Sequence, residues 1–133
     1  PEKAAALHEF GLNLGIAFQL ADDVLDYTGD PDHTGKNVGD DLNEGKLTLP
    51  LLHAMQHGSQ AERLRVADVV REKDGSAFPE IMSIVQRTGG LAITRAAAEH
   101  HSMLALKALT DFPECKALDG LKLMAQRAMD RQN

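Results

Sequence analysis

Residues 4–28 read AAALHEFGLNLGIAFQLADDVLDYT, and this stretch decides the fold. Apolar side chains recur in it at spacings of three and four, which is the period of an α-helix. They cover much of the circumference, and few charges come before the aspartates at the end, as is typical of a helix in the centre of a bundle. The positions that carry the pattern are Leu7, Phe10, Leu14, Ala17, Phe18, Ala21, Val24 and Leu25. We therefore predict one long central helix over residues 4–28.

The rest of the sequence continues the helical pattern after one interruption. Residues 29–45 are rich in Gly, Asp and Asn, which predicts a long loop. Further helices are expected over 50–56, from the cap Ser59 with Glu62 to 73, from the cap Ser76 to Gly89, over 91–109, and over 113–130 with Asp111 and Glu114 as the cap. Because no segment alternates like a strand and no linker interrupts the chain, we predict an all-α fold, with residues 1–133 forming one domain or part of one.

Length and composition exclude several classes of protein. The 133 residues suit one domain, and 43% apolar residues are too many for a disordered chain. A formal charge of −6 with five aromatic side chains and no Trp argues against nucleic acid as a partner. The longest charge-free stretch near the start is too short and too polar to span a bilayer. A lone Cys115 excludes a disulfide framework, fits a reducing compartment, and is interpreted as structural.

The negative charge is concentrated in one segment. Residues 22–46 contain seven aspartates and Glu44, against Lys36 and Lys46 as the only basic residues. The other 108 residues carry equal numbers of acids and bases, so the whole net charge of the chain belongs to this segment. Such a cluster is either a solvated loop or a site that binds cations.

Three of these aspartates form the pattern D-D-x-x-D at the end of the long helix. Asp22 and Asp26 are four residues apart and share a face, with Asp23 beside both. Carboxylates at this spacing repel one another and oppose the helix dipole near a C-terminus, so they destabilise the helix when no cation is bound. Mg²⁺ takes one or two carboxylates, keeps waters and bridges to substrate phosphates, which suits this arrangement. Most such triplets are nevertheless solvated helix ends, so the motif alone leaves two interpretations open, a solvated helix end and a magnesium site, with Gln19 one turn earlier on the same side.

The two lysines point to the other half of such a site. Lys36 and Lys46 each follow a glycine, and Asp40 and Asp41 stand between them. Ammonium groups near a carboxylate-held Mg²⁺ suit a diphosphate group. The alternative, lysines that only keep the loop soluble, does not explain why they are the only bases in the segment.

Two continuous runs carry a family resemblance. Residues 18–26, FQLADDVLD, resemble the second aspartate-rich motif of the trans-polyprenyl diphosphate synthases. Residues 35–46, GKNVGDDLNEGK, resemble the stretch that follows this motif in the family, and Thr48-Leu49-Pro50-Leu51-Leu52 completes it. The continuation to residue 55 is most similar to the bacterial octaprenyl diphosphate synthases, a long-chain branch. The expected fold is the class I isoprenoid synthase helical bundle.

The resemblance implies a role for each matched residue. It makes Asp22 a direct Mg²⁺ ligand, which Asp23 and Asp26 support directly or through waters. It assigns Lys36 and Lys46 to the diphosphate of the allylic substrate. It also places Gln19, with Phe18 next to it, at the growing allylic chain, and gives Asp40 and Asp41 a supporting position behind the lysines.

The family reaction follows from the same resemblance. Metal-assisted loss of diphosphate from an allylic diphosphate gives a cation that alkylates the double bond of isopentenyl diphosphate, a proton leaves, and the cycle repeats. The implied product is a long-chain, octaprenyl-like diphosphate for quinone side chains, delivered to the membrane by a cytoplasmic homodimer. A farnesyl or geranylgeranyl diphosphate synthase, with a shorter product, is the nearest alternative.

Several family elements are missing from these 133 residues. They are the first aspartate-rich motif, the paired arginines that follow it, and the upstream Gly-Lys and Arg for isopentenyl diphosphate. The chain is therefore expected to be the C-terminal half of a synthase and inactive alone. Without the other half, the long apolar helix is expected to expose surface and to drive self-association.

Other interpretations of the sequence remain. Asp30, Asp32, Thr34, Gly35 and Asp41 can be laid over a calcium-binding helix-loop-helix, although Pro31 intrudes and the last ligand is not Glu. His53 and His57 are four residues apart and could form a metal pair, but the sequence places no third ligand with them. A non-catalytic helical subunit that pairs with an active synthase is a further alternative, against which the intact aspartates and lysines argue.

Overall fold

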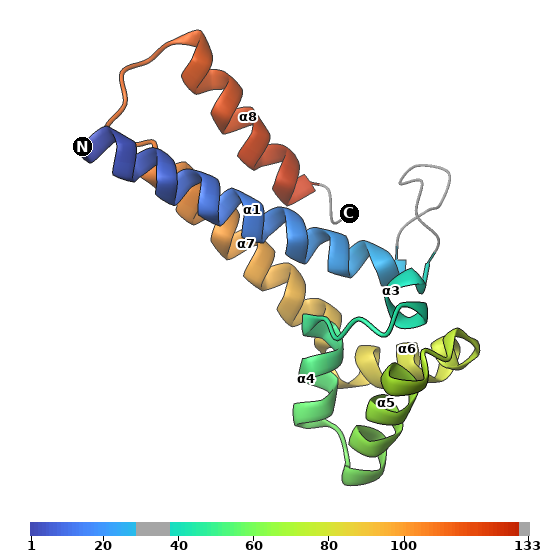
Figure 1. Cartoon of the computed structure of the whole chain (residues 1–133). Coiled ribbons are helices and arrows are strands. Elements are labelled where there is room, and N and C mark those ends of the chain that lie inside the picture. The colour runs from blue at the N-terminus through green and yellow to red at the C-terminus, as the bar shows by residue number, and fades with distance from the viewer. Residues whose placement is uncertain (29–37, 131–133) are drawn as a thin grey trace. The chain divides into compact units, whose positions relative to one another are not determined.

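The structure, a computed structural model, describes residues 1–28 and 38–130, and these residues are helical almost throughout (Figure 1). The elements are α1 (Glu2–Thr28), α3 (Asp40–Asn43), α4 (Leu49–His57), α5 (Gln60–Glu72), the 3₁₀ turn η1 (Gly75–Ala77), α6 (Phe78–Thr88), α7 (Gly90–Ala108) and α8 (Lys116–Asp130). No strand occurs within the described ranges, so the prediction of an all-α fold is confirmed. The chain divides into two compact units, Pro1–Asp22 with the chain from Arg95 onward, and Asp23–Thr94.

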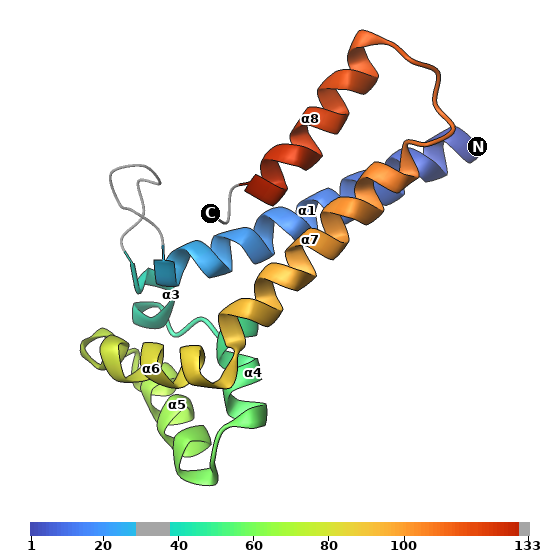
Figure 2. The ribbon, with the colours of Figure 1, turned by 180° about the vertical axis from the view of Figure 1, so that it is seen from behind.

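The first unit is built on the apolar face of α1. Phe10, Leu14 and Ala17 are buried there, as the spacing of three and four predicts. Their partners in one hydrophobic cluster are Ala105, Leu109, Leu118, Ala125 and Ala128, which come from α7, the turn after it and α8. Figure 2 shows α1 and α7 running side by side. A partly buried polar contact adds to this packing, because the His101 ring Nδ1 lies 2.8 Å from the Asn13 amide oxygen.

The second unit is a small helical cluster of α3, α4, α5, η1 and α6. Its core includes Leu42, Leu51, Val66, Val69 and Ile81, each at most 1% exposed. Charged pairs add links between α5 and the helix that follows. Arg65 donates to both carboxylate oxygens of Glu80, and Arg87 pairs with Glu62. Such exposed pairs contribute little each, so the buried apolar cluster supplies most of the stability of this unit.

Two neighbouring leucines on α4 allow a test of this core. Leu51 is fully buried, whereas Leu52 is 47% exposed. Leu51→Ala is therefore expected to lower the free energy of unfolding by about 2–5 kcal/mol. Leu52→Ala, the matched control, is expected to change it by about 0.5 kcal/mol or less. Urea denaturation followed by circular dichroism measures both, and equal losses would contradict this assignment of the core.

Most helix limits were predicted, but three local expectations are wrong. Ser59 and Glu62 form the expected reciprocal cap of α5. Ser76 does not cap a helix, because its backbone N–H donates to the Asp74 side chain. Instead, α6 begins at Phe78, and Pro79 fits the first turn because the N–H that proline lacks would have no partner within the helix there. Nor does α8 begin at 113, because it starts at Lys116, with the Cys115 Sγ accepting the Leu118 N–H at 3.4 Å. The third difference is α3, a single helical turn inside the predicted loop.

A membrane-spanning segment is not found among the helices of the two described ranges, none of which is long and apolar enough to cross a bilayer.

Candidate functional site

The three predicted metal-binding aspartates lie in the last two turns of α1. Asp22 is half-buried and is the last residue of this part of the first unit. Asp23 and Asp26 belong to the second unit and are 6% and 1% exposed. The last turn closes with the Thr28 hydroxyl donating to the Val24 carbonyl at 3.1 Å. The structure therefore separates a more accessible carboxylate, Asp22, from two that are buried.

Asp26 is tied to the backbone that follows α1. Its carbonyl oxygen accepts the Gly39 N–H at 2.9 Å, and its side-chain Oδ1 accepts the Asp41 N–H at 3.1 Å. Burial of a carboxylate is costly unless hydrogen bonds replace the lost water. The Asp41 N–H, at the start of α3, supplies such a bond. Asp26 thus holds residues 39–41 against the end of α1.

Residues 39–46, which we call the 39–46 turn, have a defined geometry that composition did not predict. Gly39 lies in the left-handed region at φ 90°, and residues 40–43 form the single helical turn α3. Gly45 is also left-handed at φ 72°, and the Lys46 N–H then donates to the Asp41 carbonyl at 2.8 Å. One helical turn with no side-chain cap is too short to be stable alone. Tertiary contacts, that with Asp26 among them, therefore stabilise it.

Lys46 ends this turn beside a buried carboxylate. Its Nζ lies 4.0 Å from Asp41 Oδ1, and the lysine side chain is 46% exposed while that of Asp41 is 5% exposed. The lysine therefore presents its ammonium group to solvent, while its backbone is fixed by the hydrogen bond to the Asp41 carbonyl. Of the predicted site residues, the structure brings together Asp26, Asp41 and Lys46.

An aromatic pair lies under the same turn. The Tyr27 ring stacks on Phe78 with centroids 5.7 Å apart and planes 25° apart. Burial raises the pKa of the Tyr27 phenol well above its ordinary value, and the Asp26 carboxylate raises it further. The Thr48 hydroxyl beside it acts in the opposite direction, while Asp41 and Asp23 add to the rise. Tyr27 therefore stays protonated and neutral throughout the physiological pH range.

The remaining predicted residues are placed as follows. Phe18 is partly buried and packs against the hydrophobic cluster of the first unit, and Gln19 next to it is exposed. Asp40 is half-buried in the first position of α3. Lys36 lies outside the described residues, as do Asp30, Asp32, Thr34 and Gly35 of the calcium-loop alternative.

The carboxylates at the end of α1 fit a divalent cation that prefers oxygen ligands. Among residues 1–28 and 38–130, no three His, Cys, Asp or Glu side chains converge on a point that could hold an ion. Mg²⁺ does not need a complete protein cage, because it binds through one or two carboxylates, waters and substrate phosphates. The oxygen-only donors of Asp22 and its neighbours match that preference.

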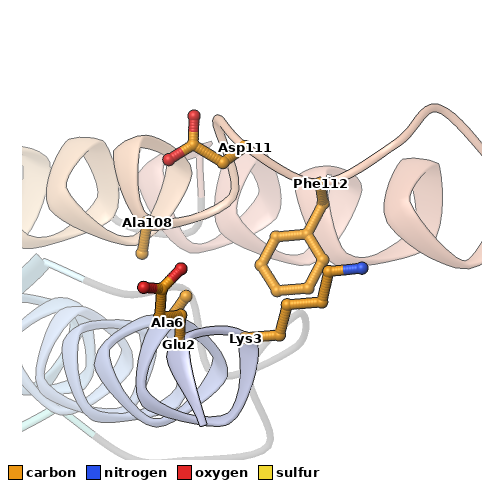
Figure 3. Close-up of a pocket in the computed structure, with 6 residues that line it drawn as sticks. All are labelled: Glu2, Lys3, Ala6, Ala108, Asp111 and Phe112. Atoms are coloured by element: carbon orange, nitrogen blue, oxygen red, sulfur yellow. The ribbon is translucent and has the colours of Figure 1, made fainter.

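Two other features of the described residues give weaker evidence for a functional site. The His53 and His57 rings lie 4.2 Å apart, but His53 Nε2 is 3.0 Å from the Thr88 carbonyl oxygen and must carry a proton to bond it. That nitrogen is therefore not a metal ligand. A pocket of about 170 Å³ in the first unit is shown in Figure 3, where Lys3 extends past the Phe112 ring. None of the predicted site residues lines it; the lining is Glu2, Lys3, Ala6, Ala108, Asp111 and Phe112.

Sequence reasoning missed the residues that support the turn. They include Tyr27, Gly39 and Phe78. Gly39 stood within the quoted motif, and glycine is the residue that adopts a left-handed backbone without strain. Phe78 is 32 residues after Lys46, and no local pattern connects the two.

The chain is similar to known proteins over most of its length. A family model described as polyprenyl synthetase matches residues 1–87. Octaprenyl diphosphate synthase of Escherichia coli (strain K12) is 43% identical over 129 residues, which cover 94% of this chain and 40% of that protein. An all-trans-nonaprenyl-diphosphate synthase of Rhodobacter capsulatus is 39% identical over 131 residues, or 98% of this chain and 40% of its own length. The chain thus spans about 40% of the length of these relatives.

Solved structures are similar over the same range. A polyprenyl synthase of Caulobacter crescentus, complexed with calcium and isoprenyl diphosphate, superposes with a TM-score of 0.87 at 36% identity, covering 99% of this chain and 41% of that one. A geranylgeranyl pyrophosphate synthase of Corynebacterium glutamicum, complexed with isoprenyl diphosphate and magnesium, gives 0.82 at 31% identity, covering 98% and 38%. The motif on α1, the turn that follows it and these matches have one explanation: the chain belongs to the polyprenyl synthetase family.

Proposed function

We propose that residues 1–133 are the C-terminal part of a trans-polyprenyl diphosphate synthase and supply the second aspartate motif and the diphosphate-binding lysines of its active site. The observation that carries this proposal is the link from Asp26 through Asp41 to Lys46. It connects the motif on α1 to a solvent-facing ammonium group through direct contacts. A solvated acidic loop would not need the two buried carboxylates of that link, Asp26 and Asp41.

Each residue then has a role in the loss of diphosphate. Mg²⁺, when bound, would supply positive charge to the leaving oxygens, and Asp22, supported by Asp23 and Asp26, would hold it. Lys46 and Lys36 would stabilise the diphosphate that departs with the electron pair of the broken carbon–oxygen bond. Gln19, with Phe18 beside it, would face the allylic chain, and Asp40 and Asp41 would fix the turn that carries Lys46.

The carbon chemistry completes the cycle. The double bond of isopentenyl diphosphate attacks the allylic cation, a carbon–carbon bond forms, and a proton leaves to restore the double bond. The product is again an allylic diphosphate, longer by one unit, so the reaction repeats. Apolar walls keep water from the cation. We propose a long-chain, octaprenyl-like product, with farnesyl or geranylgeranyl diphosphate as the alternative.

The proposal extends to the setting of the enzyme. A long prenyl diphosphate serves as a precursor of quinone side chains such as that of ubiquinone, and this lipid product passes to the membrane. We propose a homodimer in the cytoplasm. The metal is Mg²⁺, a choice supported by oxygen-only donors; one solved relative carries magnesium and another carries calcium.

A chimera tests the proposed function. In it, this chain replaces the matched part of Escherichia coli octaprenyl diphosphate synthase, which leaves that enzyme's own N-terminal part in place. We expect the chimera to condense isopentenyl diphosphate with an allylic diphosphate in a Mg²⁺-dependent way, as measured by radiolabelled product extraction. A chimera that folds, as judged by circular dichroism, and yet makes no product would contradict the proposal.

The 133-residue chain assayed by itself provides the complementary measurement. We expect no condensation, because the carboxylates that face the second motif in the family are not among its residues. The same preparation is expected to self-associate through the exposed Leu7 and Leu12 of α1, which are 44% and 51% exposed. Steady-state turnover by the chain alone, or a monodisperse monomer by light scattering at high concentration, would refute the corresponding expectation.

A further inference from the structure

We propose that residues 70–78, which join α5 to α6, support the 39–46 turn, and we call them the seat of this turn. Within the seat, Gly75 and Phe78 are positioning residues for Lys46. The inference rests on the proposed function, because it concerns how the diphosphate-binding lysine is held. Neither residue touches the substrate in this proposal. They act through the backbone of the turn, which is held in place by three contacts with residues 70–78.

The first contact is between Gly39 and Phe78. A Cβ on Gly39 would lie 3.0 Å from Phe78 Cδ2, so the ring approaches this glycine closely. The ring also stacks on Tyr27. Because Gly39 is left-handed and donates to Asp26, the ring supports the residue at which the turn departs from α1.

The second contact is between Asn43 and Gly75. A Cβ on Gly75 would collide with the Asn43 amide oxygen. The Gly75 backbone does not lie in the left-handed region, so a side chain there is opposed by the Asn43 side chain in its observed position and not by φ. The last residue of α3 is therefore seated directly on the backbone of η1.

The third contact lies one residue before the lysine. A Cβ on Gly45 would lie 2.9 Å from the Val70 carbonyl oxygen and 3.0 Å from Lys73 Cγ. Beginning, middle and end of the turn therefore each rest on residues 70–78. Since α3 is one turn long and has no side-chain cap, its position depends on this support. A shift of the seat moves Asp41 and, with it, the Lys46 ammonium group.

Amide hydrogen exchange on the 133-residue chain tests the seat itself. Gly75→Ala places a methyl group where the Asn43 side chain lies, so we expect the Gly39 and Asp41 N–H groups to exchange at least about tenfold faster. The double variant Asn43→Ala with Gly75→Ala removes the obstructing side chain and is expected to restore slow exchange. Gly120→Ala, whose Cβ would meet nothing within 4 Å, is the matched control and should leave both amides unchanged.

Steady-state kinetics of the chimera tests the consequence for the substrate. In Gly75→Ala we expect the KM for the allylic diphosphate to rise at least about tenfold, with a smaller change in kcat, and the double variant to recover most of it. If Gly75 only stabilised the fold, Gly75→Ala would instead lower thermal stability without this selective rise in KM. The inhibition constant for inorganic diphosphate should rise in parallel with KM.

The outcomes separate the two proposals. If the wild-type chimera has no activity, the proposed function fails, while amide exchange still decides whether the seat exists. The seat is overturned if Gly75→Ala leaves Gly39 and Asp41 protected, or if removal of Asn43 does not restore their protection. It is also overturned if KM for the allylic diphosphate stays at the wild-type value when both amides are exposed.

Discussion

Asp22→Ala in the chimera is expected to lower kcat for condensation at least about a hundredfold while leaving the fold intact. Asp22 is half-buried, whereas Asp23 and Asp26 are nearly inaccessible. It is therefore the carboxylate of the motif best able to reach a metal ion that bridges to substrate. Removing it takes away one ligand of a metal that uses few protein ligands. Initial rates measured over a range of Mg²⁺ concentrations should show both a lower maximum and a higher requirement for the metal.

A matched aspartate controls for the loss of a charge on a helix. Asp119 is exposed in the first turn of α8, and Asp119→Ala is expected to leave kcat near the wild-type value. Circular dichroism of both variants checks that the helices remain. Near-normal rates in Asp22→Ala, with a fold that is unchanged, would refute the assignment of the metal to this carboxylate.

Lys46→Gln is expected to raise the KM for the allylic diphosphate by about tenfold to a hundredfold, because it removes a charge-assisted bond to the leaving group. The substitution should not disturb the turn. Lys46 is anchored by its backbone N–H on the Asp41 carbonyl, and its side chain is 46% exposed. The glutamine keeps most of the aliphatic side chain and loses only the positive charge.

The chain offers a close control for this second variant. Lys122 is 43% exposed and its Nζ lies 3.7 Å from Glu114 Oε1, so it is also an exposed lysine beside a carboxylate. Lys122→Gln is expected to leave KM unchanged, and Lys46→Arg to retain more affinity than Lys46→Gln. Equal KM values for the two glutamine variants would show that Lys46 only makes the turn soluble.

The sequence predicted the features that repeat with a regular period. The apolar spacing of residues 4–28 predicted α1 to within two residues, and Ala17, Ala21 and Val24 on that pattern are fully buried. The reciprocal cap of Ser59 and Glu62 was also predicted from four residues. These features depend on neighbours in the sequence, so a local pattern contains the information.

The support of the candidate site could not be predicted in this way. The turn α3 has only four residues, and it is stabilised by Asp26 and by the seat, residues 70–78. Those contacts join residues separated by 15 to 39 positions, and no period relates them. Ser76 does not act as the predicted cap for a similar reason, since its backbone N–H and its hydroxyl both donate to Asp74. The motif thus predicts which residues carry the chemistry, while the packing decides how firmly they are held.

The central claim is that the end of α1 binds a divalent cation together with diphosphate. The most direct measurement is the broadening of backbone amide signals by Mn²⁺, a paramagnetic substitute for Mg²⁺, in spectra of the 133-residue chain with and without inorganic diphosphate. Paramagnetic broadening detects weak binding, so the measurement can be made on these 133 residues by themselves. The account predicts broadening centred on Asp22 and Asp23 that strengthens when diphosphate is added. Broadening centred on His53 and His57, or none at the end of α1 in the presence of diphosphate, would contradict it.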